Sequence, residues 1–308
     1  MSKLSNTLKA LISAPHARPS YTKPSIQKIQ PLLNSFASDA QAKEIGTPAW
    51  LTISTATAMT LNAPAVMTAL WSLAQKQDSS LSPVSAAELQ REVGLKCISF
   101  NGIPRTINCL GAFHGSLPDD VKGKLAKQAQ REFTVNNIET RKQNGLALWD
   151  NIYAGFERKL LEKLAESHPD LPVHIINGHY SNLLSNPSVS TTIPPVSGSR
   201  QPETVVGRVL TSLVAVACLR SQTGVGPQVT SHIFGLRKAY ESPKDGGAEA
   251  EGEIEVKGGK WLAGEEGNLW LLNWVDKLAG GIMEADEAGQ GQERRATSFA
   301  GGMERAKL

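Results

Sequence analysis

The alternation of apolar and polar positions is helical through most of the chain, and it is most pronounced in residues 205–220. A helix that is apolar around most of its circumference is normally buried on all sides. The apolar positions of this segment are Val206, Val209, Leu210, Leu213, Val214, Val216 and Ala217. The pattern therefore predicts a central core helix.

A second helix is predicted directly after a corner that contains Gly224 and Gly226. Pro227 suits the first turn of that helix, where a backbone N–H has no intrahelical partner. Spacing of three and four residues places His232 on one face with apolar neighbours, namely Val229, Ile233, Leu236 and Tyr240. His232 is thus expected to point toward the packed side of its helix, near Cys218 or its neighbours across the corner.

An earlier segment repeats this pattern at a constant offset, which aligns Pro64 with Pro227 and Ala69 with His232. In that copy, residues 51–61 form the buried helix that precedes the corner. Repeated units of this kind build a core together. Because only the second copy has a histidine at the shared position, we expect any chemistry to be confined to the second half of the chain.

The remaining pattern completes an all-α fold. Further helices are expected at residues 117–137, 145–167, 171–184 and 268–283, and residues 242–267 are expected to be a small acidic, glycine-rich insertion that holds a hairpin. The expected organisation is an N-terminal helical extension, a first repeat, a second repeat that contains the insertion, and a flexible tail. Their bounds are 1–46, 47–140, 141–283 and 284–308.

Composition narrows the possible functions. The 308 residues, 40% hydrophobic and 20% charged, suffice for a soluble globular protein with a core of ordinary size. The formal net charge is only +3, and no basic run is interleaved with aromatic residues, so we expect no nucleic-acid partner. Uninterrupted apolar stretches of about eighteen residues are missing from the sequence, which argues against a membrane span.

Three cysteines, Cys97, Cys109 and Cys218, are far apart and lack the spacing of metal ligands. We therefore expect reduced, buried thiols, without a metal site or another cofactor. Reduced thiols are typical of proteins that are not secreted.

The motif Arg208-x-Leu210 on the buried helix is followed by a glycine-containing turn and then by Pro227-Gln228-x-x-x-His232-x-x-Gly235. This arrangement resembles the core of the carboxymuconolactone decarboxylase and alkylhydroperoxidase D-like (AhpD-like) superfamily. Residues 145–153 and 168–183 are similar to helices that precede this core in such proteins. The resemblance covers roughly residues 47–282, and it implies an all-helical homo-oligomer with His232 as the active-site histidine.

The chain departs from the peroxidase branch of that family. Members of the branch carry a Cys-x-x-Cys pair shortly before the histidine, because one thiolate attacks the peroxide and a second thiol resolves the sulfenic acid. Val225 and Gln228 occupy those positions here, and Val209 replaces the acidic residue that follows the arginine. Peroxidase chemistry by the family mechanism is therefore not expected.

The resemblance implies that His232 acts as a general acid or base on a small organic acid, lactone or hydroperoxide. Arg208 and Gln228 would bind the substrate, with Arg208 holding a carboxylate, while Cys218 and Tyr180 would line the pocket. One alternative is a catalytically inactive oligomeric scaffold of the same fold, which the missing dithiol favours. A second alternative is residual peroxidase activity of Cys218, which would require a thiolate in an apolar interior.

The two ends of the chain carry possible targeting signals. The last three residues, Ala306, Lys307 and Leu308, are similar to the Ser-Lys-Leu peroxisomal address, and they predict recognition by the peroxisomal import receptor. Residues 4–12 form a short amphipathic piece in a basic N-terminal region, which could instead be a mitochondrial presequence. Peroxisomal delivery is the expected localisation, with the mitochondrion as the alternative.

Overall fold

The structure is a computed structural model that describes residues 4–186, 204–241 and 255–286 of the chain. Within these ranges the protein is helical, which confirms the predicted all-α class, and the β-type contact recorded there is an isolated bridge between Pro24 and Asp286. The peroxisomal address at residues 306–308, residues 1–3 of the N-terminal segment and residues 242–254 of the acidic insertion lie outside the described residues.

The bounds of the helices, in chain order, are as follows. They are α1 (Asn6–Ile12), the 3-10 turn η1 (Pro15–Ala17), α2 (Ile26–Ala42), α3 (Thr47–Thr60), α4 (Pro64–Gln77), α5 (Pro83–Lys96), α6 (Ile98–Asn101), α7 (Ile103–Ser116), α8 (Asp119–Lys122), α9 (Ile138–Tyr153), α10 (Glu157–Ser167), α11 (Asp170–His174), the π-helix η2 (Ile175–Leu184), α12 (Arg208–Arg220), α13 (Gly226–Glu241), α14 (Gly259–Leu262) and α15 (Glu265–Glu284).

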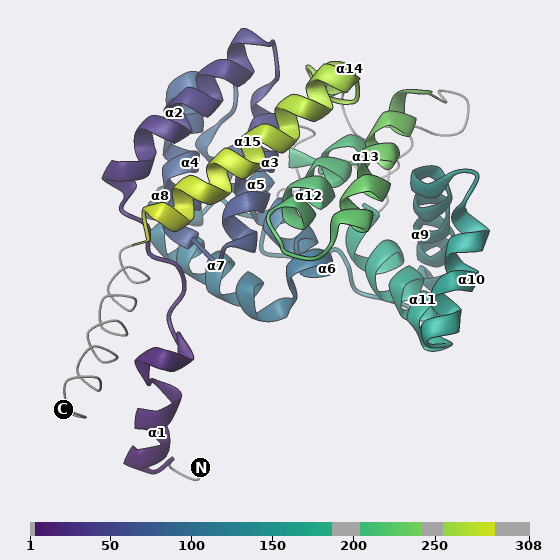
Figure 1. Cartoon of the computed structure of the whole chain (residues 1–308), viewed down its shortest axis with the longest axis horizontal. Helices are drawn as coiled ribbons and strands as arrows, with labels where there is room; N and C mark the ends of the chain where they lie inside the picture. Colours follow the sequence, from purple (N-terminus) through teal and green to yellow (C-terminus); the bar gives the residue numbers. More distant parts are fainter. Residues whose placement is uncertain (1–3, 187–203, 242–254, 287–308) are drawn as a thin grey trace, which may run out of the picture.

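Two helices, α3 and α12, pack against each other at the centre of the molecule (Figure 1). Both are buried along nearly their whole length, as their continuous apolar pattern predicts. The polar residues of α3 fit this environment because the Ser54, Thr57 and Thr60 hydroxyls donate to backbone carbonyls one turn earlier, at 2.8 to 2.9 Å. The core therefore accepts hydroxyl side chains without leaving these donors unsatisfied.

A second, smaller group of helices stands beside this core and contains α9, α10, α11 and η2 (Figure 1). It has its own buried cluster, which consists of Leu148, Trp149, Ile152, Tyr180 and Leu184. Helix α13 contacts both α12 and α9. His232 and Gly235 of α13 are buried at this junction.

The linker helix predicted for residues 117–137 is wrong beyond its first turn, because only α8 forms there. The chain then runs along α5, where one partly buried and one buried carboxylate hold it. Glu88 accepts a hydrogen bond from the backbone N–H of Ala126 at 2.6 Å, and Glu92 pairs with Arg131. These contacts with α5 replace the local hydrogen bonds that a helix would have made.

The single helix predicted for residues 145–167 is divided in two. Gly155 has a φ of 84°, a left-handed conformation that ends α9, and α10 begins at Glu157. The helix expected over residues 171–184 is α-helical only in its first part, in α11, and residues 175–184 continue it as the π-helix η2. The backbones of α9 and η2 approach each other so closely at Gly145 that a Cβ there would overlap Ser181.

The hairpin predicted within residues 242–267 is wrong for the part that the structure describes. Residues 259–262 form α14, and α15 begins at Glu265, three residues earlier than the sequence pattern indicates. Gly258, with a φ of 79°, provides the left-handed turn that starts α14. The carbonyl of Lys257 accepts a hydrogen bond from the Gly46 N–H at 3.0 Å, which ties this segment to the start of α3.

In the described ranges, no helix is both long and apolar enough to cross a membrane.

Candidate functional site

His232 lies where the main core meets the smaller helix group. It is 7% exposed, and its ring contacts Phe100 of α6 and Tyr153 of α9 edge-on, at centroid distances of 5.8 and 6.0 Å. Its burial agrees with the face predicted from the spacing along α13. The ring contacts of the imidazole are with Tyr153 and Phe100, and its expected position near Cys218 or its neighbours stays a prediction.

Two tyrosines and the histidine form a hydrogen-bonded chain. The Tyr180 hydroxyl donates to the Tyr153 hydroxyl at 3.1 Å, and the Tyr153 oxygen lies 3.4 Å from Nε2 of His232. Tyr180 comes from η2, Tyr153 from the last turn of α9 and His232 from α13. Trp149 supports both tyrosine rings, at centroid distances of 4.2 Å from Tyr153 and 5.0 Å from Tyr180. We call these three hydrogen-bonded residues the Tyr-Tyr-His cluster.

Burial keeps this cluster uncharged. It lowers the pKa of His232 to about 4, with a further contribution from the positive charge of Arg208. Burial likewise raises the pKa of the Tyr153 phenol, against the opposing effects of the Tyr180 hydrogen bond and of Arg208, and raises the pKa of Tyr180 well above its usual range. At neutral pH the cluster therefore offers neutral hydrogen-bond donors and acceptors.

The contacts of His232 favour one tautomer. Its Nδ1 is buried and has no hydrogen-bond partner among the described residues. A proton on Nδ1 would be an orphaned buried N–H, which is rarer in proteins than an unsatisfied acceptor. With the proton on Nε2, both His232 and Tyr180 donate to the Tyr153 oxygen. The hydroxyl proton of Tyr153 is then free to point elsewhere.

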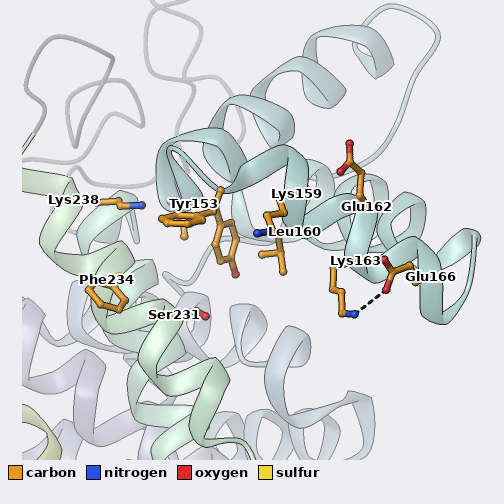
Figure 2. A pocket seen from close by; sticks show the side chains of 11 residues that line it. Tyr153, Lys159, Leu160, Glu162, Lys163, Glu166, Ser231, Phe234 and Lys238 are labelled. Carbon is orange, nitrogen blue, oxygen red and sulfur yellow. Dashed lines mark hydrogen bonds and ion pairs between the residues drawn. The ribbon is translucent and has the colours of Figure 1, made fainter.

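A cavity of about 680 Å³ opens next to the cluster, between α9, α10 and α13 (Figure 2). Its lining residues are Ile152, Tyr153, Phe156, Lys159, Leu160, Glu162, Lys163, Glu166, Ser231, Phe234 and Lys238. Tyr153 belongs to both the lining and the cluster. Tyr153 is therefore the residue through which the buried cluster meets a space of the size that small ligands occupy.

Arg208 is buried in the interior and is not among the cavity-lining residues. Its guanidinium donates to Asn151 Oδ1 at 2.6 Å, to Ser212 Oγ at 2.5 Å and to the carbonyl of Gly235 at 2.7 Å. These contacts join α9, α12 and α13. Its hydrogen bonds give Arg208 a structural role, and its charge also reaches Tyr153 and His232, where it lowers the pKa of both groups.

Two other predicted site residues lie apart from the cluster. Cys218 is fully buried, with its sulfur 3.5 Å from that of Cys97 and 3.6 Å from Asn101 Nδ2. Burial, followed by the neighbouring Cys218 thiol, raises the pKa of Cys97 well above its usual range, which disfavours a reactive thiolate there. Gln228 is exposed one turn before His232, and its side chain makes no hydrogen bond within the described residues.

The sequence did not single out Tyr153 or Lys159. Tyr153 follows the apolar positions of α9, so its spacing indicates core packing and gives no hint of a hydroxyl that faces a cavity. Gly155 was the one signal in the sequence that could have indicated the position of Tyr153. A glycine often ends a helix, and this one would place Tyr153 at the C-terminal end of α9.

Within the described residues, no group of three or more His, Cys, Asp or Glu side chains is arranged to hold a metal ion. Comparison of the chain with protein-family models, with curated proteins and with solved structures gives no match in any of the three.

Proposed function

We propose that the protein binds a small organic acid or lactone in the cavity between α9, α10 and α13 and acts on it through Tyr153, with Tyr180 and His232 as positioning residues. One observation carries the proposal: Tyr153 lines the cavity and is also the middle member of the Tyr-Tyr-His cluster.

In the proposed mechanism, the two donors on the Tyr153 oxygen direct its own O–H toward the cavity. That O–H donates to a carbonyl oxygen of the substrate and stabilises the negative charge that develops there. His232 and Tyr180 stabilise the partial negative charge that passes to the Tyr153 oxygen. The histidine therefore acts as a neutral donor behind the tyrosine, which differs from the direct acid or base role that the resemblance implies.

An AhpD-like arrangement of the helices belongs to the same proposal. It is supported by two helix pairs, α3 with α4 and α12 with α13, in which the second helix has a proline in its first turn. The first helices of the two pairs pack against each other at the centre. The histidine that distinguishes the second pair is the one that joins the cluster.

The test is turnover of a panel of carboxylated lactones and hydroperoxides by the parent protein and by Tyr153→Phe. The variant keeps the ring and removes the proton donor, so we expect a loss of about 100-fold or more in kcat. Tyr21→Phe is the matched control, because Tyr21 is 37% exposed and lies outside the cavity lining.

An inactive parent, or a Tyr153→Phe variant as active as the parent, would favour the non-catalytic scaffold. The lowered pKa of His232 is the observation that favours this second candidate, since an imidazole that stays neutral down to about pH 4 is a weak base at neutral pH. His232→Phe separates the two, because the enzyme should lose about tenfold or more of its activity while a scaffold should not respond.

A further inference from the structure

The walls of the cavity are unusually apolar for an exposed surface. Phe156 is 64% exposed and Phe234 is 58% exposed, and with Ile152 and Leu160 they line the same cavity. Large apolar groups gathered at an open cavity usually mark a binding site for an apolar group. In Figure 2, Phe234 comes from α13 and Leu160 from α10, the two helices on either side of this space.

The charged residues of the cavity differ in their contacts. Lys163 pairs with Glu166 at 2.8 Å, and Lys238 donates to the carbonyl of Ala154 at 2.6 Å while its ammonium lies 5.4 Å from the centre of the Phe156 ring. Lys159 has no ion pair or side-chain hydrogen bond with any described residue. Lys159 and Tyr153 line the same cavity.

Lys159 thus provides, in the same cavity as Tyr153, a cation that a ligand can use. Arg208, the residue expected to hold a carboxylate, is instead occupied by Asn151, Ser212 and Gly235. A negatively charged substrate would therefore have to bind through the lysines of the cavity wall.

The same charges limit the ligand to one carboxylate. Glu162 and Glu166 also line the cavity, so a second carboxylate beyond the first would meet negative charge. A cationic ligand would in turn be repelled by Lys159. The volume of about 680 Å³ leaves room for an aryl or medium-length alkyl group in addition to the carboxylate.

We propose that the ligand class of this cavity is a hydrophobic monocarboxylate, whose carboxylate pairs with Lys159 and whose apolar part packs between Phe156, Phe234 and Leu160. The inference rests on the proposed function in that it names the substrate class of the same site. A carbonyl carried by such a ligand near its carboxylate would lie within reach of Tyr153.

The experiment measures binding of four probes by calorimetry: octanoate, octanol, octylamine and the dicarboxylate suberate. We expect octanoate to bind about fivefold or more tightly than octanol and suberate, with octylamine weakest, because one partly exposed ion pair contributes on the order of 1 kcal/mol. The preference for octanoate over octanol should decrease at high salt, since salt screens an exposed pair.

The deciding variant is Lys159→Met, with Lys142→Met as the matched control on an exposed, non-lining position of α9. Lys159→Met should remove the preference for octanoate while leaving octanol binding unchanged, and Lys142→Met should leave both unchanged. Any one of four results would overturn the inference. They are equal binding of octanoate and octanol to the parent, a preference for suberate, a preference for octanoate that survives Lys159→Met, and no binding of any probe at millimolar concentration.

Tyr153→Phe distinguishes this inference from the proposed function. The variant should still bind octanoate, because its ring and Lys159 are retained. Octanoate binding that depends on Lys159, combined with turnover that does not depend on Tyr153, would reject the proposed function alone. Turnover that depends on Tyr153, combined with no preference for octanoate, would reject the ligand class alone.

Discussion

Replacement of Arg208 by methionine tests whether this buried cation holds the helices together. Methionine fills a similar volume but cannot donate hydrogen bonds. A matched variant exists on the same helix, because Arg220 of α12 forms an exposed ion pair with Asp276 at 2.6 Å, with both side chains more than 40% exposed. The two arginines thus differ in burial while they share residue type and helix.

The expected magnitude follows from the three acceptors that Arg208 satisfies. The carbonyl of Gly235 and the Ser212 hydroxyl are buried, whereas Asn151 is partly exposed and can find water. Each buried polar group left without its partner costs about 1–3 kcal/mol. Removal of a buried charge also relieves a desolvation penalty, which offsets part of this loss. We therefore expect Arg208→Met to lower the free energy of unfolding by about 2–4 kcal/mol.

Arg220→Met should cost about 1 kcal/mol or less, since exposed ion pairs contribute little. Urea unfolding monitored by circular dichroism measures both values, provided that the dependence on urea is the same for the parent and the variants. A loss for Arg208→Met no larger than that for Arg220→Met would refute the structural role. If stability were kept while octanoate binding was lost, Arg208 would be a substrate residue after all.

Two further predictions concern stability. The pKa of His232 falls from 6.5 to about 4 on folding, so the unfolded chain binds the proton more tightly, and stability is fully present above pH 6.5 and is lost as the pH falls toward 4. Urea unfolding at pH 6.5 and at pH 4 should show a loss of about 3 kcal/mol in the free energy of unfolding of the parent, and no such loss in His232→Phe. An equal loss in the parent and in His232→Phe would contradict the burial of this histidine. Gly145→Ala should destabilise the protein by about 3 kcal/mol or more, because its Cβ would overlap Ser181 and lie 2.5 Å from the Ser181 amide nitrogen. Gly111→Ala on α7 is the control, and it should stabilise the protein by up to about 1 kcal/mol because nothing lies within 4 Å of a Cβ there. Equal shifts of the melting temperature in the two variants would show that α9 and η2 do not approach each other at Gly145 as described.

The sequence predicted the parts of the fold that local periodicity determines. Helices α3 and α12 have continuous apolar faces, and both are buried at the centre. The break at Gly155 was missed because Phe156 and Leu160 continue the apolar spacing across it. The path of residues 123–137 was missed because it depends on Glu88 and Glu92 of α5, which are distant in sequence.

The site was predictable only in part for a similar reason. The spacing along α13 gives the burial of His232, but the identity of its partner depends on how α9 packs against α13. Arg208 was expected at the ligand because the resemblance to the AhpD-like superfamily implies that it holds a carboxylate. Its actual partners, Asn151 and the Gly235 carbonyl, come from two other helices, and no pattern in the sequence indicates that they meet.

The electrostatics of the cluster indicate the kind of reaction that it can assist. Burial disfavours both an imidazolium at His232 and a phenolate at Tyr153, while the fixed charge of Arg208 lowers the pKa of each group. The positive charge of Arg208 opposes protonation of His232 and favours negative charge on the Tyr153 oxygen. It therefore stabilises negative charge that develops next to Tyr153 during a reaction. Reactions that build an enolate or a tetrahedral oxyanion next to Tyr153 therefore suit the site, whereas reactions that build positive charge do not. A ligand carboxylate bound to Lys159 is compatible with such a reaction. Its negative charge would be neutralised by the lysine and would not oppose the negative charge that develops on the reacting carbonyl at Tyr153.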